Sequence, residues 1–165
     1  MPVLAVPGPV APAPPPVTVE VPEGWEALPP GTDLLHVRGP GSAGDPVEVR
    51  LRAHTGPQGY AATDLLDDLA TAVATGSEVE PLFVVEIGGL EWTARNVSWD
   101  EPTGPVVEVH LAVAVDESAG DPPGDGDAGL SRLLVATGRV RGSGLDADYD
   151  ALQSVLETVV VGGVR

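Results

Sequence analysis

Apolar and polar residues alternate over long stretches of this chain, and this pattern predicts β-strands. The clearest stretch covers Pro81 to Trp99 and Pro105 to Val115. Turn sequences interrupt it at Ile87-Gly88-Gly89-Leu90 and again between Asp100 and Gly104. Because glycine-containing turns between alternating runs are typical of hairpins, the pattern predicts a three-stranded meander.

Further strands are predicted on both sides of this meander. The alternating run Val17–Val21 predicts a half-buried strand, and the runs 34–38 and 47–53 predict a hairpin. The segments Leu82–Ile87 and Leu133–Val135 are apolar on both faces. Such strands are typical of central positions in a sheet, so we expect both segments to be covered on each side.

Helical spacing of apolar residues predicts a helix on either side of the long strands. The first covers 63–75, with Thr63 as its cap and a buried stripe made by Leu65, Leu66, Leu69, Ala72 and Val73. The second begins near Asp146 and is predicted to bury Tyr149, Leu152, Val155, Leu156 and Val159. The predicted fold class is therefore α+β, an antiparallel sheet of about six to seven strands flanked by helices.

The predicted domain organisation is a short tail followed by one folded unit. Residues 1–16 contain seven prolines and no charged side chain, which predicts an extended, disordered, polyproline-like tail. Residues 17–165 are long enough for a single domain with its own core. Within them, 117–129 consist mainly of Gly, Pro and Asp, which predicts a mobile acidic loop.

Charge and composition exclude several classes of function. With 25 acidic and 8 basic residues the net charge is −17, which repels nucleic acid and anionic membranes. The absence of cysteine excludes disulfides, thiolate catalysis and cysteine-bound zinc. Every basic residue is arginine, as GC-rich codon usage in an actinomycete would produce, with a haloarchaeal source as the alternative.

No segment of the sequence predicts membrane insertion or export. No run approaches the ~20 apolar residues of a membrane span, and the start lacks the basic region and the apolar run of a secretory signal. The expected location is therefore cytoplasmic. A mature secreted form whose signal has been removed is the alternative.

Motifs that resemble cofactor or metal sites fail in their surroundings. Gly39–Gly44 matches GxGxxG, but a strand follows where a dinucleotide site needs a helix, so a hairpin loop is predicted. Four carboxylates occupy calcium-loop positions, yet Ala151 replaces the required glycine; they are Asp146, Asp148, Asp150 and Glu157. The three histidines, His36, His54 and His110, lack the spacing of zinc ligands. We therefore expect no metal, no cofactor and no enzymatic activity.

Several of these segments together resemble the PsbP-like/LpqN superfamily. The resemblance is carried by the opening Val17–Trp25, the step Val85–Leu90, and the C-terminal helix Tyr149–Leu156, and it covers nearly everything after residue 16. It implies an antiparallel sheet sandwiched by helices. It also implies a non-enzymatic accessory role, since the members include a photosystem subunit, lipoproteins and chaperones for secreted effectors, and it supplies no catalytic residue.

Side chains on two neighbouring strands of the meander are the candidate binding site. Alternation places Arg95 and Trp99 on one face of their strand, and Glu108 and His110 lie on the next strand. Exposed aromatic and arginine side chains are typical anchors for protein partners. We therefore predict a non-catalytic adaptor or chaperone-like protein that binds a protein partner through these four residues. The alternatives are a carrier of a small apolar ligand in a pocket between sheet and helix, an enzyme whose site is assembled from scattered carboxylates, and a structural role for Trp99 beneath a helix.

Overall fold

A computed structural model describes residues 3–6, 16–29, 31–42, 44–73, 76–115 and 130–161. Its helices are α1 (Ala62–Ala72) and α2 (Leu145–Leu156). Its strands are β1 (Val3–Val6), β2 (Val17–Glu20), β3 (Glu26–Leu28), β4 (Leu35–Gly39), β5 (Val47–Pro57), β6 (Glu78–Val79), β7 (Phe83–Ile87), β8 (Leu90–Glu101), β9 (Gly104–Ala114), β10 (Leu130–Arg141) and β11 (Val160–Val161). The segment 117–129, predicted to be a loop, lies outside the described residues.

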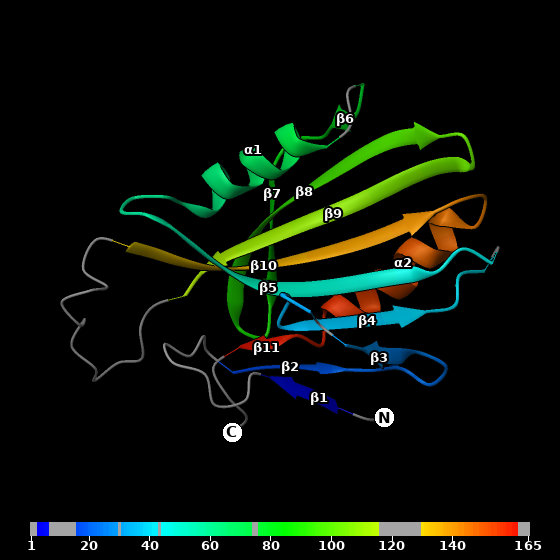
Figure 1. Cartoon of the computed structure of the whole chain (residues 1–165), viewed down its shortest axis with the longest axis horizontal. Coiled ribbons are helices and arrows are strands. Elements are labelled where there is room, and N and C mark those ends of the chain that lie inside the picture. The colour runs from blue at the N-terminus through cyan, green and yellow to red at the C-terminus, as the bar shows by residue number, and fades with distance from the viewer. Residues whose placement is uncertain are drawn as a thin grey trace.

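The strands form a large antiparallel sheet and a small one (Figure 1). The large sheet has eight strands in the order β3-β4-β5-β10-β9-β8-β6, with β7 also paired to β8. The small sheet has the order β1-β2-β11. The α+β class is confirmed, and the large sheet exceeds the six to seven strands expected because β3 and β6 are too short to show alternation.

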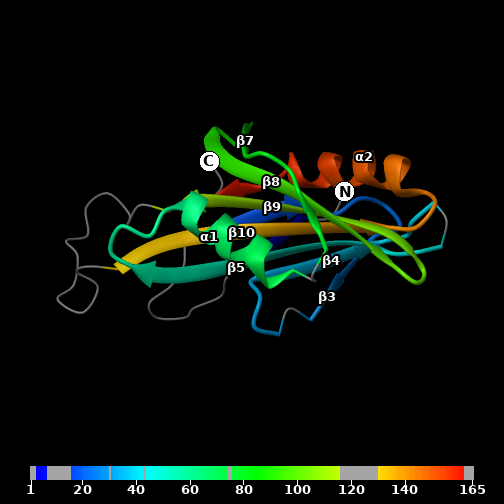
Figure 2. The same cartoon turned by 90° about the horizontal axis from the view of Figure 1, so that it is seen from above.

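The two helices lie on opposite faces of the large sheet (Figure 2). Leu65 and Leu66 of α1 pack in a cluster with Ala112, Leu133 and Val135. The alternate residues of the same strands point the other way. They join the larger cluster that contains α2 and β2, whose buried members include Leu134, Ala136, Val109, Leu111, Leu152, Val155, Val17 and Val19. The period of two along each strand thus divides the core into two layers.

Close approach of α2 to the sheet depends on a glycine in β10. A Cβ on Gly138 would lie 2.5 Å from Leu152 Cδ1, closer than van der Waals contact allows. Leu152 is fully buried, so its side chain cannot turn out to solvent. The predicted C-terminal helix is confirmed, with its apolar stripe packed on this part of the sheet.

The start of α1 differs from the sequence prediction. Ala61 is the N-cap, and Thr63 is already inside the helix. The Asp64 carboxylate accepts a hydrogen bond from the Ala61 backbone N–H at 2.8 Å. A carboxylate in the first turn can satisfy a free N–H and interact favourably with the helix dipole, which makes a Thr63 cap unnecessary.

The meander is present, but one of its strands occupies an unexpected position. The predicted turn is confirmed at Gly88 and Gly89, which have φ of 60° and 81°, as tight hairpin turns require. The segment Leu133–Val135 is central, since β10 lies between β5 and β9. The expectation that Leu82–Ile87 is also central is wrong. Among the described residues β7 pairs with β8 alone, and Phe83 and Val84 are exposed.

The proline-rich N-terminal segment is described only in part, since residues 1, 2 and 7–15 lie outside the described residues. Val3–Val6 forms β1 and pairs antiparallel with β2, although 1–16 were predicted to be a disordered tail. Its four residues contain no proline, so each backbone N–H is available for pairing with β2. Neither described helix has the length and apolar run required to span a membrane.

Candidate functional site

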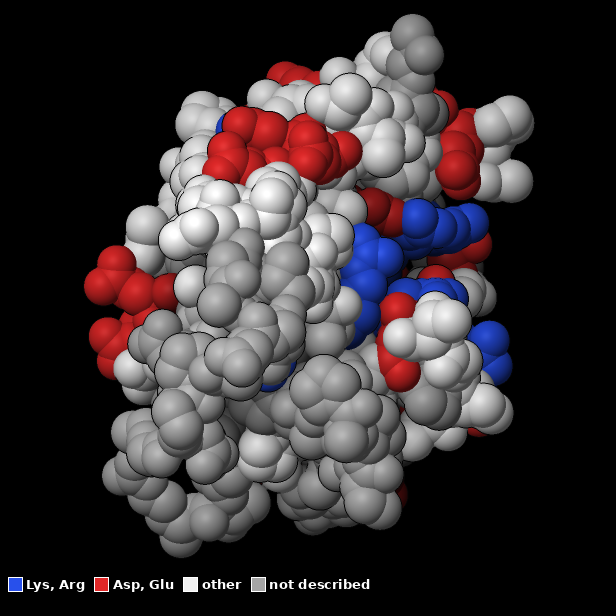
Figure 3. All heavy atoms as spheres, turned by 60° about the vertical axis from the view of Figure 1, so that its left-hand side comes forward, with Lys and Arg blue, Asp and Glu red and all other residues white. Residues whose placement is uncertain are grey.

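Charged residues occupy the part of the large sheet that α1 leaves uncovered. A row of alternating charges crosses neighbouring strands in register: Glu26, Arg38, Glu48, Arg139 and Glu108, on β3, β4, β5, β10 and β9. Opposite charges that face each other across a sheet stabilise the strand pairing. Arginine side chains gather on the face that Figure 3 presents, with carboxylates beside them.

A cavity of about 420 Å³ lies between this charged surface and the end of α1. We call it the arginine pocket, because Arg50, Arg52 and Arg139 line it. Its other lining residues are Asp33, Glu101, Glu108, His110, Thr137 and Trp99 of the sheet side, and Leu69, Ala72 and Val73 at the end of α1. It therefore combines cationic groups with an aromatic and aliphatic wall.

The base of the arginine pocket is a buried ionic cluster centred on Glu108. The side chain of Glu108 is only 7% exposed. It accepts a hydrogen bond from His110 Nε2 at 2.8 Å and another from Arg139 Nε at 2.5 Å. Burial acts to raise the pKa of the Glu108 carboxyl, but the hydrogen bonds from His110 and Arg139 outweigh burial and hold this pKa below its ordinary value.

Trp99 forms a half-exposed wall of the pocket. The guanidinium carbon of Arg139 lies 5.8 Å from the centroid of the Trp99 ring, within the range of a cation–π contact. The indole Nε1 donates a hydrogen bond to Glu101 Oε2 at 3.3 Å. Trp99 belongs to neither hydrophobic cluster of the described residues, and it lines the cavity together with residues at the end of α1.

Two groups of the arginine pocket are not engaged with other described side chains. Arg50 pairs with Asp33 at 3.2 Å and lies 4.0 Å from Glu48. Arg52, in contrast, is exposed and has no hydrogen bond or ion pair with a described residue. The buried His110 Nδ1 also lacks a hydrogen-bond partner in the described part of the chain. A free guanidinium and an unsatisfied buried nitrogen are both typical of a site that receives a polar ligand.

The structure brings together three of the four residues predicted from the sequence. Trp99, Glu108 and His110 all line the arginine pocket. Arg95 does not line it. Its guanidinium donates to Asp67 of α1 at 2.7 Å and to the Glu80 carbonyl at 3.1 Å, so it fastens α1 to the sheet.

The sequence prediction missed the arginines that complete the pocket. Arg50 and Arg52 alternate with apolar residues along β5, and Arg139 does the same along β10. Each alternation shows that one face of the strand is polar. Which residues lie beside these arginines depends on the register of β5 with β10 and of β10 with β9. These strands are far apart in the sequence, so local patterns do not reveal their register.

Among the described residues that line the pocket, Thr137 has the side-chain hydroxyl that could act as a nucleophile. Thr137 faces His110 across β9 and β10 and lines the same cavity, so the row Thr137–His110–Glu108 resembles a hydrolytic triad in composition. No hydrogen bond joins Thr137 to His110, however. In addition, Arg139 pairs with the Glu108 carboxylate. These described residues therefore lack the hydrogen bond between nucleophile and base that acyl transfer needs.

The other sequence motifs take structural roles. Asp148, a candidate calcium ligand, is buried and accepts a hydrogen bond from the Ser42 N–H at 2.8 Å, which ties the Gly39–Gly44 loop to α2. That loop connects β4 to β5, as predicted for a hairpin. Within the described residues no group of three or more His, Asp or Glu side chains is placed to hold a metal ion.

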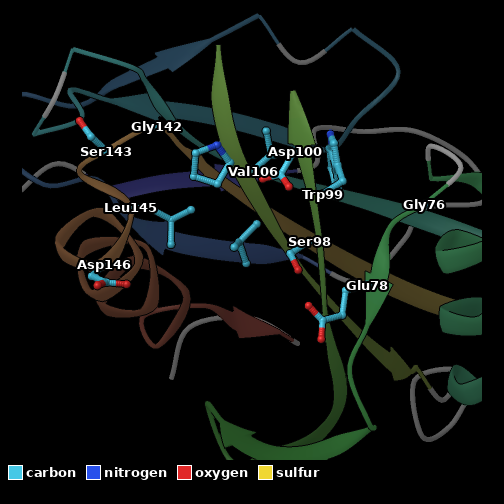
Figure 4. A pocket seen from close by; sticks show the side chains of 12 residues that line it. Gly76, Glu78, Ser98, Trp99, Asp100, Val106, Gly142, Ser143, Leu145 and Asp146 are labelled. Carbon is cyan, nitrogen blue, oxygen red and sulfur yellow. The ribbon is translucent and has the colours of Figure 1, made fainter. Parts of the chain in front are cut away.

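A larger cavity of about 560 Å³ lies beside the β8–β9 hairpin (Figure 4). Glu78, Asp100 and Asp146 line it together with Ser98 and Leu145, and none of its described lining residues is basic. Trp99 borders this cavity as well as the arginine pocket. We favour the smaller cavity as the functional site, because it contains a buried polar cluster and an unengaged cation whereas the larger one is bordered by exposed carboxylates.

Comparison with known proteins places the chain by its fold alone. No sequence-family model matches it. No curated protein sequence matches it either. Its structure is similar to the crystal structure of LpqN of Mycobacterium tuberculosis, a protein described as involved in cell envelope biogenesis. The two share a TM-score of 0.63 and 14% sequence identity over 98% of this chain and 91% of LpqN.

A second solved structure supports the same architecture more weakly. It comes from Bacteroides thetaiotaomicron, with a TM-score of 0.51 and 12% identity over 88% of this chain and 44% of that one. The chain therefore has an LpqN-like fold, as the resemblance in its sequence implies.

Proposed function

We propose that this protein is a non-catalytic accessory protein that binds a protein partner at the arginine pocket. The observation that carries the proposal is the joint placement of Trp99, Arg52 and the Glu108–His110–Arg139 cluster around one cavity. A partner segment with a carboxylate could pair with Arg52 while an apolar side chain packs on Trp99. Aromatic and arginine anchors of this kind supply much of the affinity of protein interfaces.

The electrostatics of the site support a polar segment of the partner. Arg50 and Arg139 already pair with Asp33 and Glu108, so Arg52 is the cation that remains available. The remainder of the protein repels acidic segments through its net charge of −17. A carboxylate that approaches this surface is therefore attracted at the pocket and disfavoured elsewhere, which gives the interaction its specificity.

The alternative ligand, a small apolar molecule between sheet and helix, fits this cavity less well. Three arginines and three carboxylates line the space between α1 and the sheet. An apolar ligand there would cover charged groups without providing them with partners, which costs free energy. A thermal-shift screen separates the two cases, because a carried ligand raises the melting temperature with its concentration.

The fold favours a role in the cell envelope as the setting of this binding. LpqN, which shares the fold, is described as involved in cell envelope biogenesis. We propose that the present protein also acts in the cell envelope, in place of the cytoplasmic location expected from its sequence. Fractionation of the native host decides between them by showing whether the protein is recovered with the envelope or with the cytosol.

Affinity capture with matched arginine variants tests the proposed function. Arg52→Ala removes the unengaged guanidinium of the pocket, and Arg38→Ala removes an exposed arginine of the same sheet face outside it. Capture from the native host, quantified by mass spectrometry, should recover a partner with wild type and Arg38→Ala but much less with Arg52→Ala. Equal recovery by all three proteins would show that the pocket is not the binding site.

A further inference from the structure

The β6–β7 edge of the large sheet exposes a cluster of large apolar side chains. Val79 is 44% exposed, Leu82 37%, Phe83 39% and Val84 59%. The remaining large apolar side chain of comparable exposure in the described residues is Val160, at 37%. Single exposed apolar residues are ordinary, but four within six positions mark an interaction surface.

The sequence of β7 is that of a covered strand, whereas its position is that of an edge. Phe83, Val84, Val85 and Ile87 place apolar side chains on both faces, as central strands do. Yet β7 pairs only with β8 in the described part of the chain, so its other edge offers backbone N–H and C=O groups. Edge strands are normally protected by charged side chains, proline or bulges. Among its five residues β7 has one charged side chain, Glu86, and no proline, and its register with β8 is unbroken.

The charges around this edge identify the kind of strand that could cover it. Four exposed carboxylates lie in or beside β7: Glu86 within the strand, and Glu78, Glu80 and Glu91 before and after it in the sequence. No basic residue occurs between positions 76 and 94. A second copy of this chain would bring these carboxylates close to their counterparts, in a protein of net charge −17. A strand with basic side chains would neutralise them.

We propose that the outer edge of β7 receives an extended segment of a partner protein in which apolar and basic residues alternate. The segment adds a strand to the sheet, and its backbone pairs with β7. Its apolar side chains cover Phe83 on one face of the sheet, and its basic side chains lie on the other face, where Glu86 and Glu91 are paired beside Val84. This surface selects positive charge, so it is distinct from the arginine pocket, which selects negative charge.

Binding of synthetic peptides, followed by fluorescence anisotropy and amide hydrogen exchange, tests this proposal. The probe is a peptide of about ten residues with alternating valine and arginine, the length of a typical strand pair. One control peptide has glutamate in place of arginine. A second has the probe's sequence with N-methylated alternate residues, which keeps the charge but removes the backbone donors.

The expected result is binding of the probe alone, with slowed amide exchange within residues 83–87. Val84→Arg, a change at an exposed side chain, should weaken binding at least about tenfold by repulsion, whereas Val84→Thr should retain it. Equal binding of the N-methylated peptide, or protection outside β7, would show nonspecific attraction and overturn the proposal. A stable dimer in sedimentation without peptide, disrupted by Val84→Arg, would identify a second copy as the occupant and overturn it as well.

Discussion

Arg139 lies over the ring of Trp99, with its guanidinium carbon 5.8 Å from the ring centroid, while its nitrogens hold the buried carboxylate of Glu108. The same side chain thus links the half-exposed aromatic wall of the arginine pocket to the ionic cluster at its base. Because β10 supplies Arg139 and β8 and β9 supply the other two residues, the site depends on the register of these strands.

The first prediction compares two tryptophans on opposite faces of β8. Trp92 is 1% exposed and belongs to the main core, so Trp92→Ala should cost about 3–5 kcal/mol of unfolding free energy. Trp99 is half-buried, so Trp99→Ala should cost about 1–2 kcal/mol and should weaken partner binding by about 2 kcal/mol or more. Denaturant unfolding and affinity measurements check both. If Trp99→Ala is as destabilising as Trp92→Ala, the ring is part of the core and not an anchor.

The second prediction concerns the coupling between Glu108 and Arg139. Arg139→Leu should destabilise the fold by about 2–3 kcal/mol, less than the ~3–5 kcal/mol of a wholly buried pair, because the Arg139 side chain is 38% exposed. The double variant Glu108→Leu/Arg139→Leu should lose less than the sum of the single variants, by about 1 kcal/mol or more. Additive losses in the double-mutant cycle would contradict direct coupling.

The third prediction is a pH dependence of stability that Glu108 contributes. Its pKa in the folded protein is below the ordinary value of 4.5, so below that value the unfolded state binds the proton more readily. The stabilisation by Glu108 is complete above pH 4.5 and is lost as the pH falls towards the lowered pKa of the folded state. Glu108→Gln should therefore lose less stability than wild type when acidified below about pH 4.5. Identical losses in parallel melts at pH 7 and pH 3.5 would contradict this.

The fourth prediction tests the close approach of α2 to the sheet. Gly138→Ala should destabilise the protein by about 1–3 kcal/mol through overpacking against the buried Leu152. Leu152→Ala removes the atoms that the new Cβ would meet. In the double variant the additional cost of Gly138→Ala should therefore nearly disappear. An undiminished cost, measured by denaturant unfolding, would place the strain elsewhere.

The sequence predicted the elements that have long periodic patterns, and it failed where pairing over long sequence distances decides the outcome. The Gly88-Gly89 hairpin and the two helices depend on local sequence patterns, and all three elements are present. The residues of β7 are apolar on both faces, which predicted a central strand. Such a pattern indicates that the strand needs to be covered, but it does not say which part of this chain, or of another molecule, covers it. Arg52 and Arg139 were not predicted as site residues, because the residues beside them are determined by the register of β10 with β5 and β9.

Site-specific photocrosslinking in the native host tests whether a partner binds at the arginine pocket. A benzophenone side chain at Ala72, an exposed residue that lines the pocket, should form an adduct with one partner protein. The same group at Ala151, exposed on α2 at the opposite face, is the control and should not form it. We predict that Arg52→Glu abolishes the Ala72 adduct while the protein remains folded. An adduct that persists in Arg52→Glu, or that forms equally from position 151, would show that the partner does not bind at the arginine pocket.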